Sequence, residues 1–267
     1  MAIDLFGIRS VLFLPASNPR AIAKARTTDA DLVVLDLEDA VKPADKASAR
    51  EAAVAAVAEP WSMPVAIRIN GVGSEWHEAD AAAVAHSRAD FGALPRAASA
   101  GDAKRVRDAL GKSLLAMIET AAGVLAAPEI AREVSGLVAG TNDLAADLRL
   151  PPGAGRGSLQ AALQLIVLAA RASQVAVFDG VFNALADAEG FAAEAGEGRR
   201  LGFDGKSLIH PDQIGPCHCA FAPSEAEIDR ARRLIAASTG GAERFEDEMI
   251  EGMHVEAARR LLERASF

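Results

Sequence analysis

Tyrosine is absent from this sequence, and cysteine occurs only twice. Without tyrosine, no phenol can carry a proton in any reaction that the protein catalyses. The two cysteines, Cys217 and Cys219, are separated by a single residue, which gives no basis for a disulfide framework. A reducing compartment is therefore expected, because disulfides accumulate in oxidising compartments.

Long apolar runs and an excess of positive charge are also missing. The longest nearly apolar stretch, LQLIVLAA at 163–170, is far too short to span a bilayer. The N-terminal MAIDLFGIRSVLFLPA carries an early acid and a very short apolar run, so a signal peptide is not expected. The formal net charge of −9 makes nucleic acid and anionic membranes unexpected partners. A cytoplasmic protein with a small-molecule substrate is the expectation.

What the sequence does contain is a regular alternation of two patterns. Apolar runs of strand length alternate with stretches at helical spacing that are rich in alanine, arginine and glutamate, such as 43–59 and 100–111. Repeated eight times in 267 residues, this order predicts an α/β fold, a (β/α)8 TIM barrel. An open sheet of about six or seven strands is the main rival, because 91–95 and 136–140 are weak strands. The expected strands are 10–15, 32–38, 65–70, 91–95, 114–119, 136–140, 175–180 and 205–211.

Beyond the eighth expected strand the pattern changes. Residues 224–238 are expected to form a capped amphipathic helix, with Ser224 as the N-cap and Glu227 three residues later. A Gly-Gly turn follows at 240–241, and residues 246–265 close the chain. We therefore predict a TIM-barrel domain over 1–223 and a C-terminal helical extension over 224–267. This extension would pack on its own barrel or reach a neighbouring subunit.

Acidic side chains gather at the ends of the expected strands. In a barrel these ends meet at one mouth, which is where such folds place their chemistry. Several carboxylates facing a single arginine call for a hard cation such as Mg²⁺, which prefers oxygen ligands. The arginine can then hold a substrate carboxylate through two hydrogen bonds. The acids are Asp36, Glu38, Asp39, Glu119 and Asp143, and the arginine is Arg68.

Simpler structural roles stay open for several of these residues. Arg68 can form an ion pair with Asp36, and Asp143 can cap the helix that follows it. A second cluster, His210 with Cys217, His218 and Cys219, hints at zinc, but its spacing matches no structural zinc pattern. His210 is expected instead to support the barrel mouth through hydrogen bonds.

The motifs at these positions resemble those of the citrate lyase β-subunit-like proteins. That group lies within the HpcH/HpaI aldolase/citrate lyase family, which includes malyl-CoA and citramalyl-CoA lyases. The order and spacing of the motifs make the resemblance specific, and it runs from about residue 9 to the end of the chain. The motifs are RSVLFLPASNPRAIAKA (9–25), LVVLDLEDAVKPADKASAR (32–50), VAIRING (65–71), AMIETAAGVLAAPEIA (116–131), GTNDLAADL (140–148), LGFDGKSLIHPDQI (201–214) and FAPSEAEIDRARRL (221–234).

The resemblance implies a Mg²⁺-dependent carbon–carbon lyase. Such an enzyme cleaves a hydroxyacyl-CoA, such as malyl-CoA or citramalyl-CoA, into a ketoacid and an acyl-CoA, or forms it from them. The resemblance places the metal on Glu119 and Asp143. Glu119, through the metal, and Arg68 would bind the acid end of the substrate. Glu38 and Asp39 would orient water and neighbouring groups beside the metal.

Contacts to the rest of the substrate and to other subunits follow from the same resemblance. Basic residues after the first two expected strands, Arg20 and Lys46 among them, are candidates for the anionic CoA tail, although a solvated helix face explains them as well. The family is commonly trimeric or hexameric, so a homo-oligomer is expected. Glu251 of one subunit would then carry a proton at the site of its neighbour.

The sequence departs from the usual family motifs at three places. Asn142 stands where a glutamate is usual beside the metal ligand, Arg96 stands for a lysine, and Glu251 stands for an aspartate. These changes concern the choice of substrate more than the metal site. Two other functions stay open: a metal-dependent aldolase of free hydroxy-ketoacids, and a partner-dependent citrate lyase-like β subunit. The acyl group, the physiological direction and the oligomer size are not determined by the sequence.

Overall fold

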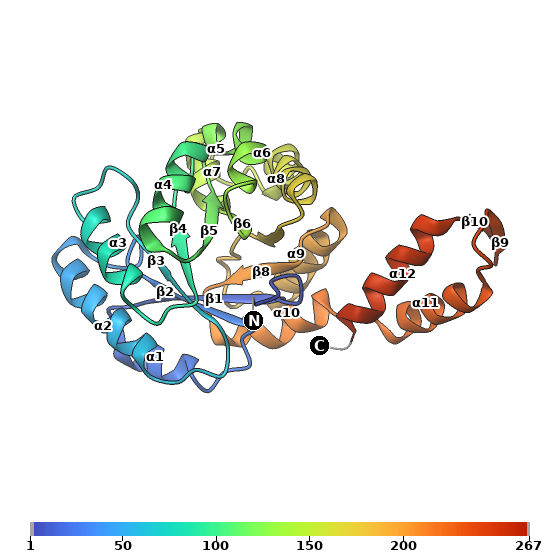
Figure 1. Ribbon diagram of the computed structural model, residues 1–267, viewed down its shortest axis with the longest axis horizontal. Helices are drawn as coiled ribbons and strands as arrows, with labels where there is room; N and C mark the ends of the chain where they lie inside the picture. The colour runs from blue at the N-terminus through green and yellow to red at the C-terminus, as the bar shows by residue number, and fades with distance from the viewer. Residues whose placement is uncertain (1–2, 266–267) are drawn as a thin grey trace. The chain divides into compact units, whose positions relative to one another are not determined.

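The computed structural model describes residues 3–265, and its central feature is a closed barrel of eight parallel strands (Figure 1). The strands follow one another around the barrel in chain order, and β1 closes it by pairing with β8. This closure confirms the predicted TIM barrel and excludes the open sheet. The strands are β1 (Ser10–Pro15), β2 (Leu32–Asp36), β3 (Val65–Arg68), β4 (Phe91–Leu94), β5 (Ser113–Ile118), β6 (Gly136–Ala139), β7 (Ala176–Asp179) and β8 (Gly205–Leu208).

All barrel strands except β1 end earlier than the apolar runs suggested. The strand β2 stops at Asp36, because the carboxylate of Asp36 accepts hydrogen bonds from the backbone N–H groups of Glu38 and Ala40. These two bonds turn the chain out of the sheet, so Glu38 lies on a loop. Asn70, which was expected on β3, also lies beyond the strand.

Helices connect and surround the strands, as the alternating pattern predicted. The predicted helix over 43–59 is a short 3-10 turn, η1 (Pro43–Asp45), followed by α2. The helices of the barrel are α1 (Pro19–Ala25), α2 (Lys46–Ala58), α3 (His77–Ala85), α4 (Ala100–Leu110), α5 (Ala121–Leu125), α6 (Ala127–Ala131), α7 (Thr141–Asp147), α8 (Gln160–Ser173), α9 (Ala188–Leu201) and α10 (Ile214–Phe221), with 3-10 turns η2 (Arg156–Leu159) and η3 (Pro211–Gln213). None of the helices in residues 3–265 is long and apolar enough to cross a bilayer.

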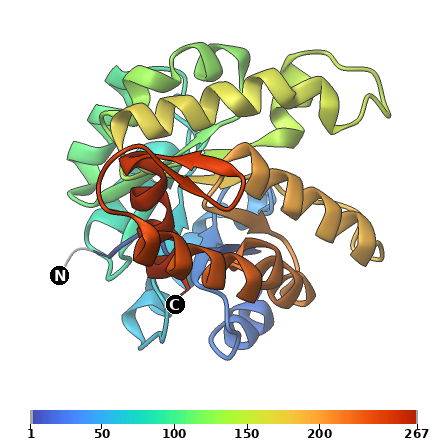
Figure 2. The ribbon, with the colours of Figure 1, turned by 90° about the vertical axis from the view of Figure 1, so that its right-hand side faces the viewer.

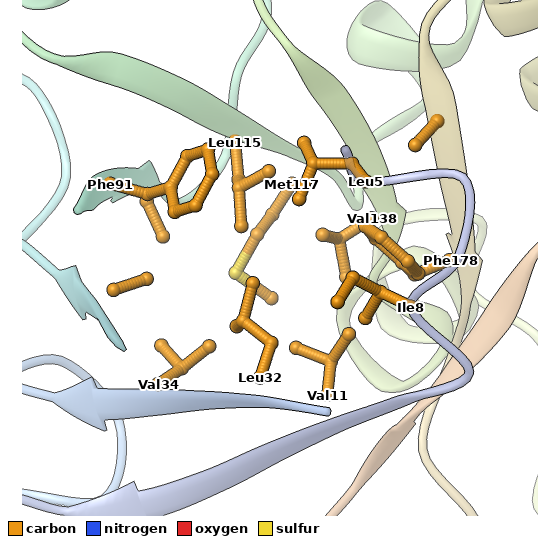
Figure 3. Close-up of a cluster of buried hydrophobic side chains, with 13 residues drawn as sticks. Leu5, Ile8, Val11, Leu32, Val34, Phe91, Leu115, Met117, Val138 and Phe178 are labelled. Carbon is orange, nitrogen blue, oxygen red and sulfur yellow. The ribbon is translucent and has the colours of Figure 1, made fainter. Parts of the chain in front are cut away.

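Apolar side chains fill the interior of the barrel (Figure 3). They come from alternate positions of the strands, such as Val11 on β1 and Leu115 and Met117 on β5. Continuing the same alternation past Met117 brings Glu119 to the mouth of the barrel. The packed interior therefore forms a rigid floor beneath the polar residues.

The chain divides into two compact units, residues 1–220 and 221–267. The predicted boundary lay at 223/224, and the last two residues of the predicted extension, 266–267, are outside the described residues. In the second unit, α11 (Glu225–Ala237) begins with the predicted capping box of Ser224 and Glu227. It packs against α12 (Gly252–Arg264) (red in Figures 1 and 2).

A hairpin in the second unit was not predicted. The strands β9 (Glu243–Phe245) and β10 (Glu248–Ile250) pair in antiparallel fashion between the two helices (Figure 2). Phe245 and Ile250 are buried against residues of both helices, including Leu234 and Val255. The extension is therefore helical with an inserted hairpin, and it has a small apolar core of its own.

Candidate metal and substrate site

A cavity of about 370 Å³ opens at the carboxyl ends of the barrel strands. Its polar lining includes the arginine and four of the five acids that the sequence singled out, namely Asp36, Asp39, Arg68, Glu119 and Asp143. Glu38 is not part of the lining, but it contacts Arg68. Apolar side chains such as Phe13 and Met117 form other parts of the wall. The structure thus brings acids and an arginine from four separate segments to one site, as expected from the barrel topology.

Arg68 lies at the centre of the acidic cluster. Its Nε and Nη2 donate to the two carboxylate oxygens of Asp36 at 2.5 and 2.6 Å, so the structural ion pair considered from sequence does form. The third nitrogen, Nη1, lies 2.9 Å from Oε2 of Glu38 and 3.7 Å from Oδ2 of Asp39. The bidentate bond to Asp36 fixes the plane of the guanidinium, and Phe13 stacks against it with 5.5 Å between Cζ and the ring centroid. Arg68 is therefore a fixed positive charge in the cavity wall.

Glu38 is a carboxyl group that keeps its proton unusually well. Burial raises its pKa to about 8, and the negative charges of Asp39 and Glu119 act in the same direction, while Arg68 opposes them. A carboxyl with a pKa near neutrality can both take and return a proton at working pH. Glu38 is accordingly the strongest candidate for a general base or acid in this cluster.

Glu119 and Asp143, the predicted metal ligands, line the same cavity and share one neighbour, Arg96. The backbone N–H of Arg96 donates to Oε1 of Glu119 at 2.6 Å, and its side-chain Nη1 donates to Oδ1 of Asp143 at 3.1 Å. Burial raises the pKa of Glu119 to about 7. Asp143 lies in the first turn of α7 without capping it, so the capping alternative is wrong. The sequence marked Arg96 only as a departure from the family motif, and its contact with both carboxylates was missed.

The donor set around Glu119 and Asp143 fits a Mg²⁺ ion. Both residues offer carboxylate oxygens, and magnesium commonly takes one or two protein carboxylates together with water and substrate oxygens. Gly140 leaves room for this arrangement, because a Cβ at that position would collide with the carboxylate of Glu119. Among residues 3–265, no group of three or more His, Cys, Asp or Glu side chains is arranged to hold a metal. A metal here would therefore depend on solvent and substrate to complete its shell.

Lys46 was expected to contact the CoA tail, and the structure places it elsewhere. Its side chain is buried, and Nζ donates to the carbonyls of Leu37 and Glu38, each at 2.7 Å, and to Oδ1 of Asn70 at 2.6 Å. All three ammonium protons are thus used within the chain. This geometry favours a role in fixing the loop after β2, which carries Glu38 and Asp39, over a direct contact with substrate.

Two other predicted residues lie outside the acidic cluster. Arg20 is exposed in the first turn of α1, after β1, where it remains available to an anionic ligand. Glu251 lies in the second unit, where its side chain forms a capping box with His254 at the start of α12. Its action on a neighbouring subunit stays a prediction.

The cluster of His210, Cys217, His218 and Cys219 does not form a zinc site. His210 follows the carboxyl end of β8 and accepts a hydrogen bond from the backbone N–H of Asp212, which is the kind of support expected of it. His218 instead bonds Ser10 Oγ, at the amino end of β1, over 2.8 Å. The cluster is therefore divided between the two ends of the barrel.

The comparisons with known proteins agree with this fold. The profile of the HpcH/HpaI aldolase/citrate lyase family matches residues 9–211, and that of a carbon–carbon bond lyase of the TIM-barrel fold matches 158–267. By its fold and candidate site, the protein is a TIM-barrel protein with acids and a fixed arginine at the mouth of the barrel. The chain belongs to the HpcH/HpaI aldolase/citrate lyase family, as its motifs suggested.

Individual relatives cover nearly the whole chain. A (3S)-malyl-CoA thioesterase of Cereibacter sphaeroides is 41% identical, over 99% of this chain and 97% of the relative. CitE of Mycobacterium tuberculosis, solved with magnesium, acetoacetate and coenzyme A, is 34% identical with a TM-score of 0.88, over 98% of this chain and all of that one. A citrate lyase β subunit of M. tuberculosis, solved with oxaloacetate and magnesium, is 33% identical with a TM-score of 0.74, over 83% of this chain and all of that one.

Proposed function

We propose that this protein is a Mg²⁺-dependent carbon–carbon lyase that cleaves a hydroxyacyl-CoA of the malyl-CoA type into a ketoacid and an acyl-CoA. The observation that carries this proposal is the arrangement at the cavity, which is lined by Arg68 and the carboxylate pair of Glu119 and Asp143, with the protonatable Glu38 in contact with Arg68. Relatives named for malyl-CoA chemistry, and relatives solved with magnesium, oxo acids and coenzyme A, support the same substrate class.

Each residue of the site has a task in this proposal. Glu119 and Asp143 hold Mg²⁺, which when bound acts as a Lewis acid toward the hydroxy-carboxylate end of the substrate. Arg68 fixes the substrate carboxylate and adds positive charge where negative charge grows during cleavage. Asp36 keeps the guanidinium in place, and Asp39 helps to orient neighbouring water.

The bond changes divide between a base and an acid. Glu38 takes the proton of the substrate hydroxyl, and the carbon that carries it becomes the carbonyl carbon of the ketoacid. The electron pair of the broken carbon–carbon bond moves to the carbon next to the thioester, which then accepts a proton. Glu251 of a neighbouring subunit is the proposed donor, in a homotrimer or homohexamer. Arg20 is proposed to contact the anionic CoA tail.

Hydrolysis of the same thioester is a second candidate function. The specific observation in its favour is the 41% identity, over 99% of the chain, to a protein named (3S)-malyl-CoA thioesterase. The two reactions share the substrate and the metal site but break different bonds. Cleavage of the carbon–carbon bond leaves the thioester intact, whereas hydrolysis releases the free thiol of CoA.

Product analysis separates the two reactions. The purified protein is incubated with (3S)-malyl-CoA and, separately, with citramalyl-CoA, each with Mg²⁺ or with a chelator. Metal-dependent formation of glyoxylate or pyruvate without free thiol supports the lyase, and free thiol without ketoacid supports the hydrolase. If the folded protein binds Mg²⁺ but forms neither product, both the lyase and the hydrolase are excluded for these substrates. The remaining functions are then an aldolase of free hydroxy-ketoacids and a partner-dependent citrate lyase-like β subunit.

A further inference from the structure

Ser207, on β8, is a polar residue inside the barrel that has no task in the reaction described above. Its neighbours Lys206 and Leu208 point to the other side of the strand, since Lys206 Nζ bonds Asp179 and Glu194, the latter on α9 outside the barrel. The alternation of side chains therefore turns Ser207 inward. It lines the same cavity as Arg68 and Met117, and it is 2% exposed.

The hydroxyl of Ser207 is buried without a hydrogen-bond partner in the described part of the chain. Two other buried side-chain atoms share this condition, Ser74 Oγ and Arg156 Nε, and neither residue lines the cavity. By contrast, the acids and the arginine at the mouth bond one another or a backbone N–H. Buried polar groups are nearly always paired in folded proteins, and an exception at a cavity wall indicates a partner supplied from within the cavity.

The surroundings of Ser207 limit what that partner can be. In the register of the barrel, Ser207 lies opposite Val11 of β1, and Phe178 of β7 lies opposite Gly205, the preceding inward position on β8. Thr141, another hydroxyl residue of the lining, lies beside Gly180, whereas Val11 and Phe178 are apolar. Such surroundings suit a compact ligand that presents a polar atom at this depth. A serine hydroxyl donates to a carboxylate or carbonyl oxygen and accepts from a hydroxyl, so it can bond both the hydroxy acid and the ketoacid formed from it.

We propose that Ser207 binds an oxygen atom of the small acid end of the substrate, at the floor of the cavity below Arg68, and so contributes to the choice of that acid. The side chain reaches the ligand by rotation about χ1, which is a staggered three-fold torsion in serine. This assignment rests on the proposed function, because it takes the acid end of a malyl-CoA-type thioester as the ligand of the cavity. It makes Ser207 a substrate-contacting residue that the motifs did not indicate.

The assignment predicts opposite effects of Ser207→Ala on stability and on binding. Removing an unpaired buried hydroxyl leaves no broken hydrogen bond, so Tm of the free protein rises by about 2–4 °C. The same change weakens binding of pyruvate or oxaloacetate in the presence of Mg²⁺ by about tenfold, because the ligand loses one hydrogen bond. Calorimetry measures the affinities, and thermal unfolding without ligand measures Tm.

Ser10→Ala is the matched control. Ser10 is also a buried serine, on the neighbouring strand β1, but its hydroxyl bonds His218 and accepts from the N–H of Asp31. We expect this variant to lower Tm and to leave the affinity for the oxo acids unchanged. Equal affinity of Ser207→Ala and the wild type overturns the assignment while the proposed function stands. Failure of the wild type to bind any oxo acid with Mg²⁺ overturns the proposed function, and the ligand assigned to Ser207 with it.

Discussion

Single residues at the mouth of the barrel are defined by their partners as much as by their own chemistry. Arg68 illustrates this, because its Nε and Nη2 are held by Asp36 while Nη1 faces Glu38. From the sequence, Arg68 could form either a structural ion pair with Asp36 or a contact with substrate. The structure shows that the ion pair leaves one nitrogen on the side of the catalytic candidate Glu38, so the two roles are compatible.

Arg68→Lys tests whether the planar guanidinium matters. A lysine keeps the positive charge but cannot bond Asp36 through two nitrogens and face Glu38 with a third. We expect kcat/KM for the thioester to fall by about 100-fold or more, with Mg²⁺ affinity changed little. Steady-state kinetics beside calorimetry of Mg²⁺ binding gives the comparison. Wild-type kinetics in this variant would show that charge alone is sufficient.

If Glu119 binds Mg²⁺ as proposed, the affinity for Mg²⁺ should depend on pH. The pKa of Glu119 is raised to about 7, chiefly by burial, so below neutral pH a proton competes with the metal for this carboxylate. We expect the affinity for Mg²⁺ to be about tenfold higher at pH 8 than at pH 6, as measured by calorimetry. Glu119→Gln removes the titrating group and should reduce both the affinity and its pH dependence. An affinity independent of pH in the wild type would remove Glu119 from the metal site.

Stability without metal should show the opposite dependence. The folded-state pKa values of Glu38 and Glu119 are raised from 4.5 to about 8 and about 7. A carboxyl group with a raised pKa binds its proton more tightly in the folded protein than in the unfolded chain. Its contribution to stability is complete below the pKa of the unfolded chain, and it is lost as pH rises through the pKa of the folded protein. In a chelator, Tm should therefore fall between about pH 5 and pH 8, and saturating Mg²⁺ should reduce that fall.

At the scale of elements, the strands position the acids and the loops orient them. The loop after β2 is fixed from below by Lys46, which bonds two of its carbonyls and Asn70. Periodicity located the strands closely enough for the acids to be placed at one mouth, although most strands end earlier than predicted. Periodicity could not show that Lys46 is buried beneath this loop. A lysine that contacts a ligand and a lysine that supports a loop can both follow a strand end in the sequence. The contact of Arg96 with Glu119 and Asp143 was missed for a similar reason, since it depends on a backbone conformation with φ of 49°.

Lys46→Met tests the support of this loop. The variant keeps the length of the buried chain but removes three hydrogen bonds, those to Leu37 O, Glu38 O and Asn70 Oδ1, so the loop with Glu38 and Asp39 loses part of its support. We expect kcat to fall by about tenfold or more, and Tm to fall by several degrees. Lys42→Met is the control, because Lys42 is an exposed lysine of the same loop. A loss of thioester affinity at unchanged kcat would instead restore the predicted contact between Lys46 and the CoA tail.

Gly140, between β6 and α7, provides the space for the carboxylate of Glu119. Gly140→Ala should displace this carboxylate and lower Mg²⁺ affinity by about tenfold or more, since outer-shell contacts typically have effects of that size. Gly157→Ala is the matched control, because a Cβ at Gly157 meets no atom within 4 Å. Unchanged metal affinity in the first variant would argue against Glu119 as a ligand.

At the scale of the whole molecule, the barrel was predicted almost in full, while the second unit was predicted only in part. The helix α11 and its capping box followed from Ser224 and Glu227, but the hairpin at 243–250 did not. Its strands are three residues each, which is too short for an alternating pattern to identify. The core of this unit joins the hairpin to both helices, a set of long-range contacts that no local pattern displays.

The proposed role of Glu251 can be tested with mixed subunits. If Glu251 serves the site of a neighbour, the variants Glu119→Gln and Glu251→Gln should each be inactive alone. Subunits of the two variants, dissociated and reassembled together, should regain part of the wild-type turnover, because some sites then combine an intact metal pair with an intact Glu251. No recovery in a mixed oligomer confirmed by ultracentrifugation would mean that Glu251 has no such role.

The central claim is that Glu119 and Asp143 hold a metal with which Arg68 and Glu38 cleave a malyl-CoA-type thioester. The most direct measurement is the rate of ketoacid release from (3S)-malyl-CoA and citramalyl-CoA, at increasing Mg²⁺, for the wild type and for Glu119→Gln. The account predicts turnover that rises with Mg²⁺ in the wild type, is abolished by a chelator, and is lost in the variant. Equal turnover of Glu119→Gln, or turnover that persists in the chelator, would contradict it.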